Sequence, residues 1–196
     1  DINKPNEILS LLIEAEGLEL SETELLHQCI FMLNAGHETS TNMLSHGLNE
    51  LINHKDEYKL LQKEPERIDT AVDEILRFQP PIQINNRRCL EKTKLGDVVV
   101  PEGTSVHMII AGANRDPLQF FKPETFDISR SPNRHLSFGL GIHICAGINL
   151  ARVEAKVAFQ SLMSSFREIN LLKKPKIANR IRFREIKEMQ IEISSF

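Results

Sequence analysis

The sequence predicts a mainly α-helical protein with a small β-sheet, and three observations support this fold class. Apolar residues recur at helical spacing over residues 21–52, and helical spacing returns over residues 146–166. Between them, residues 84–110 alternate with the shorter period that is typical of strands. Because 41% of the 196 residues are hydrophobic, the chain can bury a substantial core, and we expect a single domain over residues 1–196.

The first predicted helix is long and has a recognisable start. Ser21 and Glu24 form the capping-box pattern S-x-x-E ahead of an apolar run that continues to Ile52. About 30 helical residues span roughly 45 Å, which is enough to cross a whole domain. The preceding segment, residues 1–20, has neither a clear cap nor an initiator Met, so we expect a processed or truncated product.

Shorter elements follow this helix. We expect a second helix over residues 56–62 and a third between Pro65 and Pro80, because proline suits the first turn of a helix and interrupts its interior. The strand-like residues 84–110 contain turn signals with glycine, and they predict the small sheet.

The second half of the chain begins with a long irregular segment. Residues 114–141 carry prolines and glycines without sustained periodicity, which predicts a loop. A loop of this length stays ordered in a compact domain only where something organises it, and such loops are usually functional. A helix is then expected over residues 146–166, and the alternation over residues 177–193 predicts a terminal β-hairpin.

Charge and composition argue against several classes of function. Lys and Arg number 24 and Asp and Glu number 27, with both signs scattered along the chain, so we expect no nucleic-acid partner. The longest apolar stretches are too short to span a membrane and the N-terminus resembles no signal peptide, so we expect a cytoplasmic protein without a membrane partner. The three cysteines form neither a disulfide framework nor a CxxC pair.

Candidate chemistry concentrates in residues 138–147, FGLGIHICAG. Cys145 lies at the start of a predicted helix, where the helix dipole and free backbone N–H groups stabilise a thiolate. Gly139, Gly141 and Gly147 let the backbone wrap closely around a bulky group. The segment therefore suits a sulfur atom that ligates a metal.

Other interpretations of this segment fit less well. A cysteine before a helix is often an inert core residue, and this alternative stays open at the level of the residues. A dinucleotide-binding GxGxxG would need glycine in place of Ile144, and no Gly-Lys-Ser/Thr of a P-loop follows. His143 and Cys145 are spaced like a zinc pair, but the neighbouring sequence offers no further two ligands.

FGLGIHICAG resembles the haem-binding loop of the cytochromes P450, FxxGxxxCxG, in the His-containing form common among soluble bacterial members. The resemblance implies that the Cys145 thiolate ligates the iron of haem b (iron protoporphyrin IX) and that Phe138 packs beside the sulfur. It also implies that His143 meets a haem propionate. Arg87 falls where the family often has an arginine that binds a haem propionate. The adjacent Arg88 could serve instead, and an ordinary surface arginine on a strand is an equally good interpretation of Arg87.

A second stretch, AGHET at residues 35–39, resembles the oxygen-binding segment AGxxT of the same family. On a helix, the Thr39 hydroxyl can bond back to the carbonyl of Ala35 four residues earlier. The resemblance implies that Glu38 and Thr39 relay protons as an acid and alcohol pair, and that Ala35 lets the haem face approach the helix closely.

A third stretch, EILR at residues 74–77, resembles the family's ExxR motif. A spacing of three brings Glu74 and Arg77 onto one face of a helix, where they can pair. Alone, such a pair is usually a solvated surface ion pair worth little. The resemblance implies a buried structural network with Arg130 from the long loop, although Arg134 lies close by in the sequence.

The resemblance also implies which residues face a substrate. They are Phe31, Asn34, the stretch 82–84 and the C-terminal hairpin near Ile181. These residues are apolar or carry amides, so the sequence does not identify the substrate.

The resemblance covers about residues 18–193, yet these correspond to only the C-terminal half of the cytochrome P450 fold. It implies the catalytic half of a haem-thiolate monooxygenase that oxidises a small organic substrate with electrons from a ferredoxin- or flavin-type donor. The alternative is a non-catalytic haem-binding fragment whose apolar surface drives self-association or binding of the missing N-terminal half. A helical structural module would require three ordered motif matches by chance.

Overall fold

The computed structural model describes residues 8–17 and 19–196. Expectations for residues 1–7, and for residue 18 as the start of the resemblance, lie outside the described part. The chain divides into two compact units, the first ending at Thr39 and the second beginning at Ser40, and each is described by itself.

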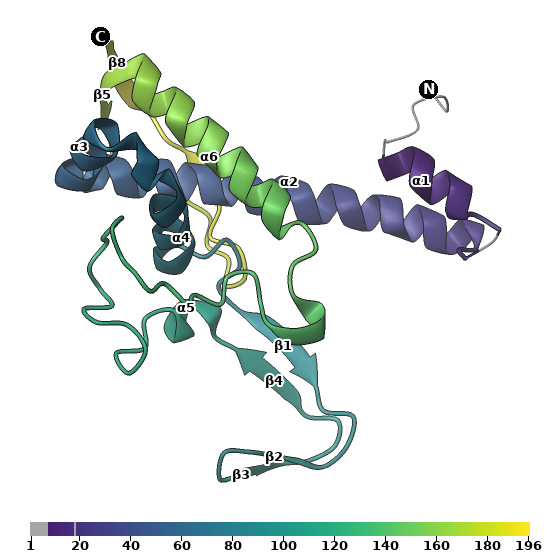
Figure 1. Cartoon of the computed structure of the whole chain (residues 1–196). Coiled ribbons are helices and arrows are strands. Elements are labelled where there is room, and N and C mark those ends of the chain that lie inside the picture. Colours follow the sequence, from purple (N-terminus) through teal and green to yellow (C-terminus); the bar gives the residue numbers. More distant parts are fainter. Residues whose placement is uncertain (1–7, 18) are drawn as a thin grey trace. The chain divides into compact units, whose positions relative to one another are not determined.

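The first unit contains helix α1 (Ile8–Ala15) and the first part of helix α2 (Glu22–Asn53), which continues into the second unit (Figure 1). The predicted capping box is confirmed at the start of α2. The backbone N–H of Ser21 donates to Glu24 Oε2 at 2.9 Å, and the backbone N–H of Glu24 donates to Ser21 Oγ at 3.3 Å. None of the described helices combines the length and the apolar character needed to cross a membrane.

The second unit adds helix α3 (Lys55–Lys63), the 3₁₀ turn η1 (Pro65–Arg67), helix α4 (Ile68–Phe78) and helix α6 (Ile148–Ser165). These elements confirm the predicted helices to within a few residues. Proline at the first position of η1 has no N–H to leave unpaired, which is why the chain restarts there as a helix.

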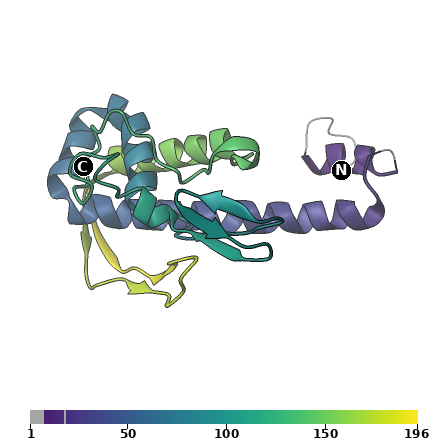
Figure 2. The same cartoon turned by 90° about the horizontal axis from the view of Figure 1, so that it is seen from below.

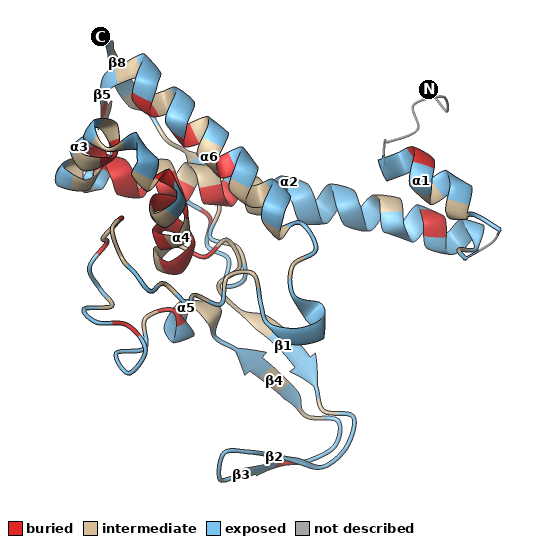
Figure 3. Cartoon of the chain, in the orientation of Figure 1, coloured by how far each residue is buried: buried red, intermediate tan, exposed pale blue. Residues whose placement is uncertain are grey.

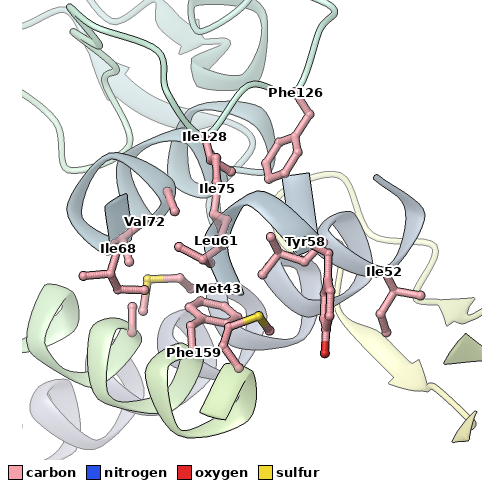
Figure 4. Packing of buried hydrophobic residues seen from close by; sticks show 14 of the residues in the cluster. Met43, Ile52, Tyr58, Leu61, Ile68, Val72, Ile75, Phe126, Ile128 and Phe159 are labelled. Atoms are coloured by element: carbon pink, nitrogen blue, oxygen red, sulfur yellow. The ribbon is translucent and has the colours of Figure 1, made fainter. Parts of the chain in front are cut away.

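The hydrophobic core of the second unit lies where α3, α4 and α6 pack against the C-terminal part of α2 (Figure 4). Burial is concentrated along α4, which is drawn largely in red in Figure 3. The buried core residues are Met43, Leu51, Ile52, Tyr58, Leu61, Ile68, Ala71, Val72, Ile75, Leu76, Phe126, Ile128, Ala155, Phe159, Met163 and Ile169. Since Phe126 and Ile128 come from the long loop, the core also holds that loop against the helices.

The strands form antiparallel pairs, and Figure 2 shows the C-terminal ones in yellow. The strands are β1 (Asn85–Arg88), β2 (Thr93–Leu95), β3 (Val98–Val100), β4 (Ser105–Met108), β5 (Phe166–Leu171), β6 (Lys176–Ile177), β7 (Ile186–Glu188) and β8 (Ile191–Ser195). β1 pairs with β4, β2 with β3, β5 with β8 and β6 with β7. The register places Arg87 opposite Val106 and Ile169 opposite Ile193.

The structure differs from the sequence expectations in three places. The helix expected to reach residue 166 ends at Ser165, and Phe166 begins β5. Residues 177–193 are not one hairpin, because only β6 and β7 pair locally, whereas β8 pairs with the distant β5. The short helix α5 (Ile110–Ala113) was not predicted. Strand pairing across 20 or more residues leaves no local periodic signal, which explains why β5 was missed.

Candidate functional site

The centre of the second unit is an ion pair between two side chains of α4. Glu74 and Arg77 are both 0% exposed. Arg77 Nε donates to Glu74 Oε2 at 2.7 Å and Arg77 Nη2 donates to Glu74 Oε1 at 2.8 Å. This bidentate geometry is the strong form of the interaction, and it offsets part of the cost of burying two charges.

The remaining donors of Arg77 bind the long loop. Nη1 donates to the carbonyls of Asn114 at 2.9 Å and Pro123 at 2.8 Å, and Nη2 donates to the carbonyl of Thr125 at 3.0 Å. All five N–H groups of the guanidinium therefore have acceptors. The loop of residues 114–141 is ordered because a buried cation in α4 satisfies its carbonyls.

Arg130 completes this network. Its Nε donates to Glu74 Oε2 at 3.1 Å, and its two terminal nitrogens donate to loop carbonyls. Arg134, the alternative in the sequence, is exposed. Asn133 adds a further bond, with Nδ2 donating to Glu74 Oε2 at 3.1 Å. The structure thus brings Glu74, Arg77 and Arg130 together, as the sequence predicts.

Asn114 is an organising residue that the sequence interpretation missed. It is 0% exposed, its Oδ1 accepts the backbone N–H of Leu136 at 2.8 Å, and its Nδ2 donates to Ser137 Oγ at 2.9 Å. Ser137 Oγ in turn donates to the carbonyl of Leu76 at 2.7 Å. These bonds connect the residues just before Phe138 to α4. In the sequence, Asn114 opens the segment NRDP at residues 114–117, whose residue types are typical of a turn and do not indicate burial.

The loop around Cys145 has a tight, glycine-dependent backbone. Gly139 and Gly141 have φ values of +72° and +77°, in the left-handed region that other residues rarely adopt. The backbone N–H of Cys145 donates to the carbonyl of Phe138 at 2.8 Å, which closes the loop. Between them lies a single 3₁₀ turn, η2 (Gly141–His143), and the half-buried Cys145 lies three residues before α6.

A small polar cluster lies next to the Phe138 ring. The Arg152 guanidinium lies 5.5 Å from the centre of the Phe138 ring, and the His135 ring centre lies 5.8 Å away. Asp73 Oδ1 accepts from Arg152 Nη2 at 2.7 Å and lies 3.5 Å from His135 Nε2. Burial raises the pKa of Asp73, but the hydrogen bond to His135 and the charge of Arg152 outweigh it and hold the pKa below its usual value.

The residues around Cys145 fit a haem group. Leu140, Ile142 and Ile144 on this loop are 80%, 96% and 50% exposed, which gives an apolar surface of the kind that a porphyrin covers. Within residues 8–17 and 19–196, no group of three or more His, Cys, Asp or Glu side chains could hold a metal ion. The zinc interpretation therefore gains no ligands, whereas in haem the macrocycle supplies them and one thiolate suffices.

His143 and Arg87 carry the exposed nitrogen donors expected to meet haem propionates. His143 lies in η2 beside Cys145, and Arg87 lies on β1, where one terminal nitrogen donates to the carbonyl of Asn86 at 2.9 Å. Arg88 is also exposed, so exposure does not separate the two arginines. Their side chains point to opposite faces of the strand, because residues alternate along β1.

Ala35, Glu38 and Thr39 lie on the part of α2 that belongs to the first unit. Thr39 Oγ1 donates to the carbonyl of Ala35 at 2.5 Å, which confirms the predicted back-bond. Glu38 is half-buried. The placement of these three residues against Cys145 stays a prediction.

Comparison with known proteins decides the family. The cytochrome P450 family model matches residues 1–183. The chain belongs to the cytochrome P450 family. The polyketide biosynthesis cytochrome P450 PksS of Bacillus subtilis (strain 168) is 41% identical over 177 residues, which cover 89% of this chain and 44% of that P450. The biotin biosynthesis cytochrome P450 of the same organism is 39% identical over 166 residues, covering 84% of this chain and 42% of the relative.

Solved structures agree with this P450 assignment. The structure of the Bacillus subtilis 168 bacillaene polyketide synthase cytochrome P450 PksS matches with a TM-score of 0.92 and 36% identity. The match covers 99% of this chain and 52% of that P450. The chain therefore has the P450 fold and spans about half the length of the P450s it matches.

Proposed function

We propose that this chain is the catalytic half of a haem-thiolate monooxygenase, which oxidises a small organic substrate with O2 and electrons from a redox partner. The observation that carries the proposal is the Cys145 loop. Its half-buried thiol follows two left-handed glycines and lies on a loop with exposed apolar side chains, and this loop is anchored through Asn114 to the buried network of α4. A haem bound there would supply oxygen activation, which thiolate ligation favours.

In this proposal the chain's own residues hold the group and orient it. Cys145 Sγ would be the ligand, and Phe138 would pack beside it. Gly139 and Gly147 would let the backbone lie close to the group, since neither has a Cβ. Arg87 and His143 would bind its propionates by charge and hydrogen bonds.

The proton steps are assigned to Thr39 and Glu38. A hydroxyl has one donor and two acceptor sites, so Thr39 Oγ1 can accept a hydrogen bond from a water or an acid while it donates to the Ala35 carbonyl. To deliver a proton, the hydroxyl must rotate away from that carbonyl. Glu38 would replace the proton, and Ala35 leaves room beside the hydroxyl.

The substrate class and the redox partner are assigned more coarsely. We propose a small organic substrate and a ferredoxin- or flavin-type electron donor. One matched structure, 33% identical with a TM-score of 0.88, is that of P450BioI in complex with hexadec-9Z-enoic acid ligated acyl carrier protein. Carrier-linked acyl chains are therefore a reasonable first class of substrate to test here.

A second candidate is a non-catalytic haem-binding or self-associating fragment. Two observations favour it: the chain spans about half the length of its relatives, and large apolar side chains on the first part of α2 are exposed. Leu26, Ile30, Phe31 and Leu33 are between 56% and 74% exposed.

Turnover distinguishes the two candidates. The haem-loaded chain is assayed for O2-dependent product formation with a ferredoxin and its reductase, alone and together with the N-terminal half of a matched P450. Product in either sample supports the monooxygenase. Haem binding without product in both samples supports the non-catalytic fragment.

A further inference from the structure

His46 is a buried side chain that the proposed mechanism does not use. It lies on the second-unit part of α2 and is 5% exposed. Its Nε2 donates to the backbone carbonyl of Arg184, which is 138 residues away in the sequence. A buried imidazole is costly unless it is hydrogen-bonded, so this contact accounts for its presence in the interior.

Arg184 belongs to the 178–185 loop, which joins β6 to β7. The loop is closed at its base, where the backbone N–H of Ala178 donates to the carbonyl of Glu185 at 2.7 Å. Beyond that base, the loop buries few side chains: Ile181 is 81% exposed, and Arg182 is exposed too. Side-chain packing therefore holds this loop only weakly, and hydrogen bonds to its main chain determine where the loop lies.

One of these bonds connects the 178–185 loop to a second segment, residues 79–83. The backbone N–H of Gln83 donates to the carbonyl of Arg182 at 2.9 Å. Gln79, at the end of α4, links this second segment to α2, because its Nε2 donates to Glu50 Oε1 at 2.7 Å. Since Glu50 lies one helical turn after His46, α2, the 79–83 segment and the 178–185 loop form a closed ring of contacts.

We infer that His46 is a positioning residue, which sets the place of the 178–185 loop and, through Arg182, of the 79–83 segment. The consequence for the reaction rests on the proposed function and on the substrate-facing residues that the family resemblance implies, which include residues 82–84 and Ile181. His46 then determines the separation of these two segments, and with it the fit of the substrate.

Hydrogen exchange tests this inference on the chain without haem. The amides of Gln83 and Ala178 report on the loop, because both donate to carbonyls within residues 178–185. The amide of Cys89, bonded to the carbonyl of Thr104 at 2.9 Å, serves as the reference for the rest of the fold. The variants are His46→Leu, which removes the donor, and His46→Gln, which keeps an N–H of similar reach.

His46→Leu is expected to lower the protection of Gln83 and Ala178 by about tenfold while Cys89 keeps its protection, and His46→Gln is expected to restore most of it. The matched control is Ser45→Ala, because among the described residues the Ser45 hydroxyl donates to the carbonyls of Thr41 and Asn42 in its own helix. Unchanged protection in His46→Leu, or an equal loss at Cys89, would overturn the inference. Since no haem is needed, the result is independent of the proposed function.

Discussion

Thr39 is the residue on which the proposed proton steps depend. Its hydroxyl donates to the Ala35 carbonyl within α2, so its replacement removes one local hydrogen bond and leaves the ligand loop untouched. In the haem-loaded enzyme, Thr39→Ala is expected to retain the spectrum of the parent. We expect it to consume O2 while forming several-fold less product, because general acid catalysis is lost.

The readout is the ratio of product formed to O2 consumed. Thr39→Ser, which keeps the hydroxyl, is the matched control and should retain most of the coupling. If Thr39→Ala couples O2 consumption to product as well as the parent does, the assignment of Thr39 is wrong.

Asp73 is expected to make the stability of the fold depend on pH. Its pKa is held below the usual value of about 3.9 because the contacts with His135 and Arg152 outweigh the effect of burial. A carboxyl with a lowered folded-state pKa contributes stability above its unfolded pKa and loses it as the pH falls through the folded value. Unfolding by denaturant should therefore show Asp73→Asn less stable than the parent at pH 7, with the difference shrinking below about pH 4. A constant difference would contradict this account.

At the scale of elements, α4 and the long loop depend on one buried carboxylate. Glu74→Ala leaves the fully buried Arg77 without its anion and removes the acceptor of Arg130 Nε, so we expect a loss of about 3–5 kcal/mol in the free energy of unfolding. The structure provides a matched control with the same spacing in Glu64, which pairs with Arg67 near the surface.

Glu64→Ala should cost about 0–1 kcal/mol, since partly exposed pairs contribute little. Denaturant unfolding of the two variants measures the difference. Equal losses would show that burial of the Glu74 pair contributes nothing to the order of the loop.

The packing of α2 against α6 requires a residue without a side chain at Gly47. A Cβ at Gly47 would stand 2.5 Å from Phe159 Cζ and 2.9 Å from Ile75 Cγ2, both in the core. Gly47→Ala is therefore expected to destabilise the fold by about 1–3 kcal/mol, despite the better helix propensity of alanine. At Gly36 in the same helix, no described atom lies within 4 Å of that position.

Gly36→Ala is thus the control, and it should raise stability by about 0.5–1 kcal/mol through helix propensity alone. Thermal unfolding of both variants tests the packing of α2 against α6. Stabilisation by Gly47→Ala would mean that these helices lie further apart than the structure places them.

Some elements could be predicted because nearby residues determine them, whereas others depend on contacts with distant segments. The helices follow from apolar spacing, the Ser21 cap and the proline at residue 65, all of which act within a few residues. β5 depends on its pairing with β8, so a sequence window at Phe166 shows only the end of a helix. The pairing of Glu74 with Arg77 follows from spacing, whereas their burial depends on tertiary packing and was expected only through the family motif.

The same division holds at the site. Cys145 could be predicted because the glycines, the helix start and the cysteine lie within ten residues. Asn114 could not, because an asparagine in a turn is usually exposed, and its burial depends on Leu136, Ser137 and Arg77 together. The burial of a residue such as Asn114 therefore cannot be inferred from its local sequence, because it depends on contacts between segments that are distant along the chain.

For the whole molecule, the central fact is that a P450 chain of this length spans about half of its relatives. The second unit nevertheless has its own core, and its cysteine loop is fixed by bonds within that unit. The ligand loop is therefore expected to form in this chain alone. Exclusion of water from the haem would depend on what covers the apolar surface at Leu140 and Ile142.

The most direct test of the central claim is the absorption spectrum of the haem-loaded protein, reduced and exposed to carbon monoxide, for the parent and for Cys145→Ser. The account predicts the strongly red-shifted Soret band of thiolate-ligated haem in the parent and its loss in the variant. The same red-shifted band in Cys145→Ser, or its absence from haem-loaded parent protein, would contradict the assignment of Cys145 as the ligand.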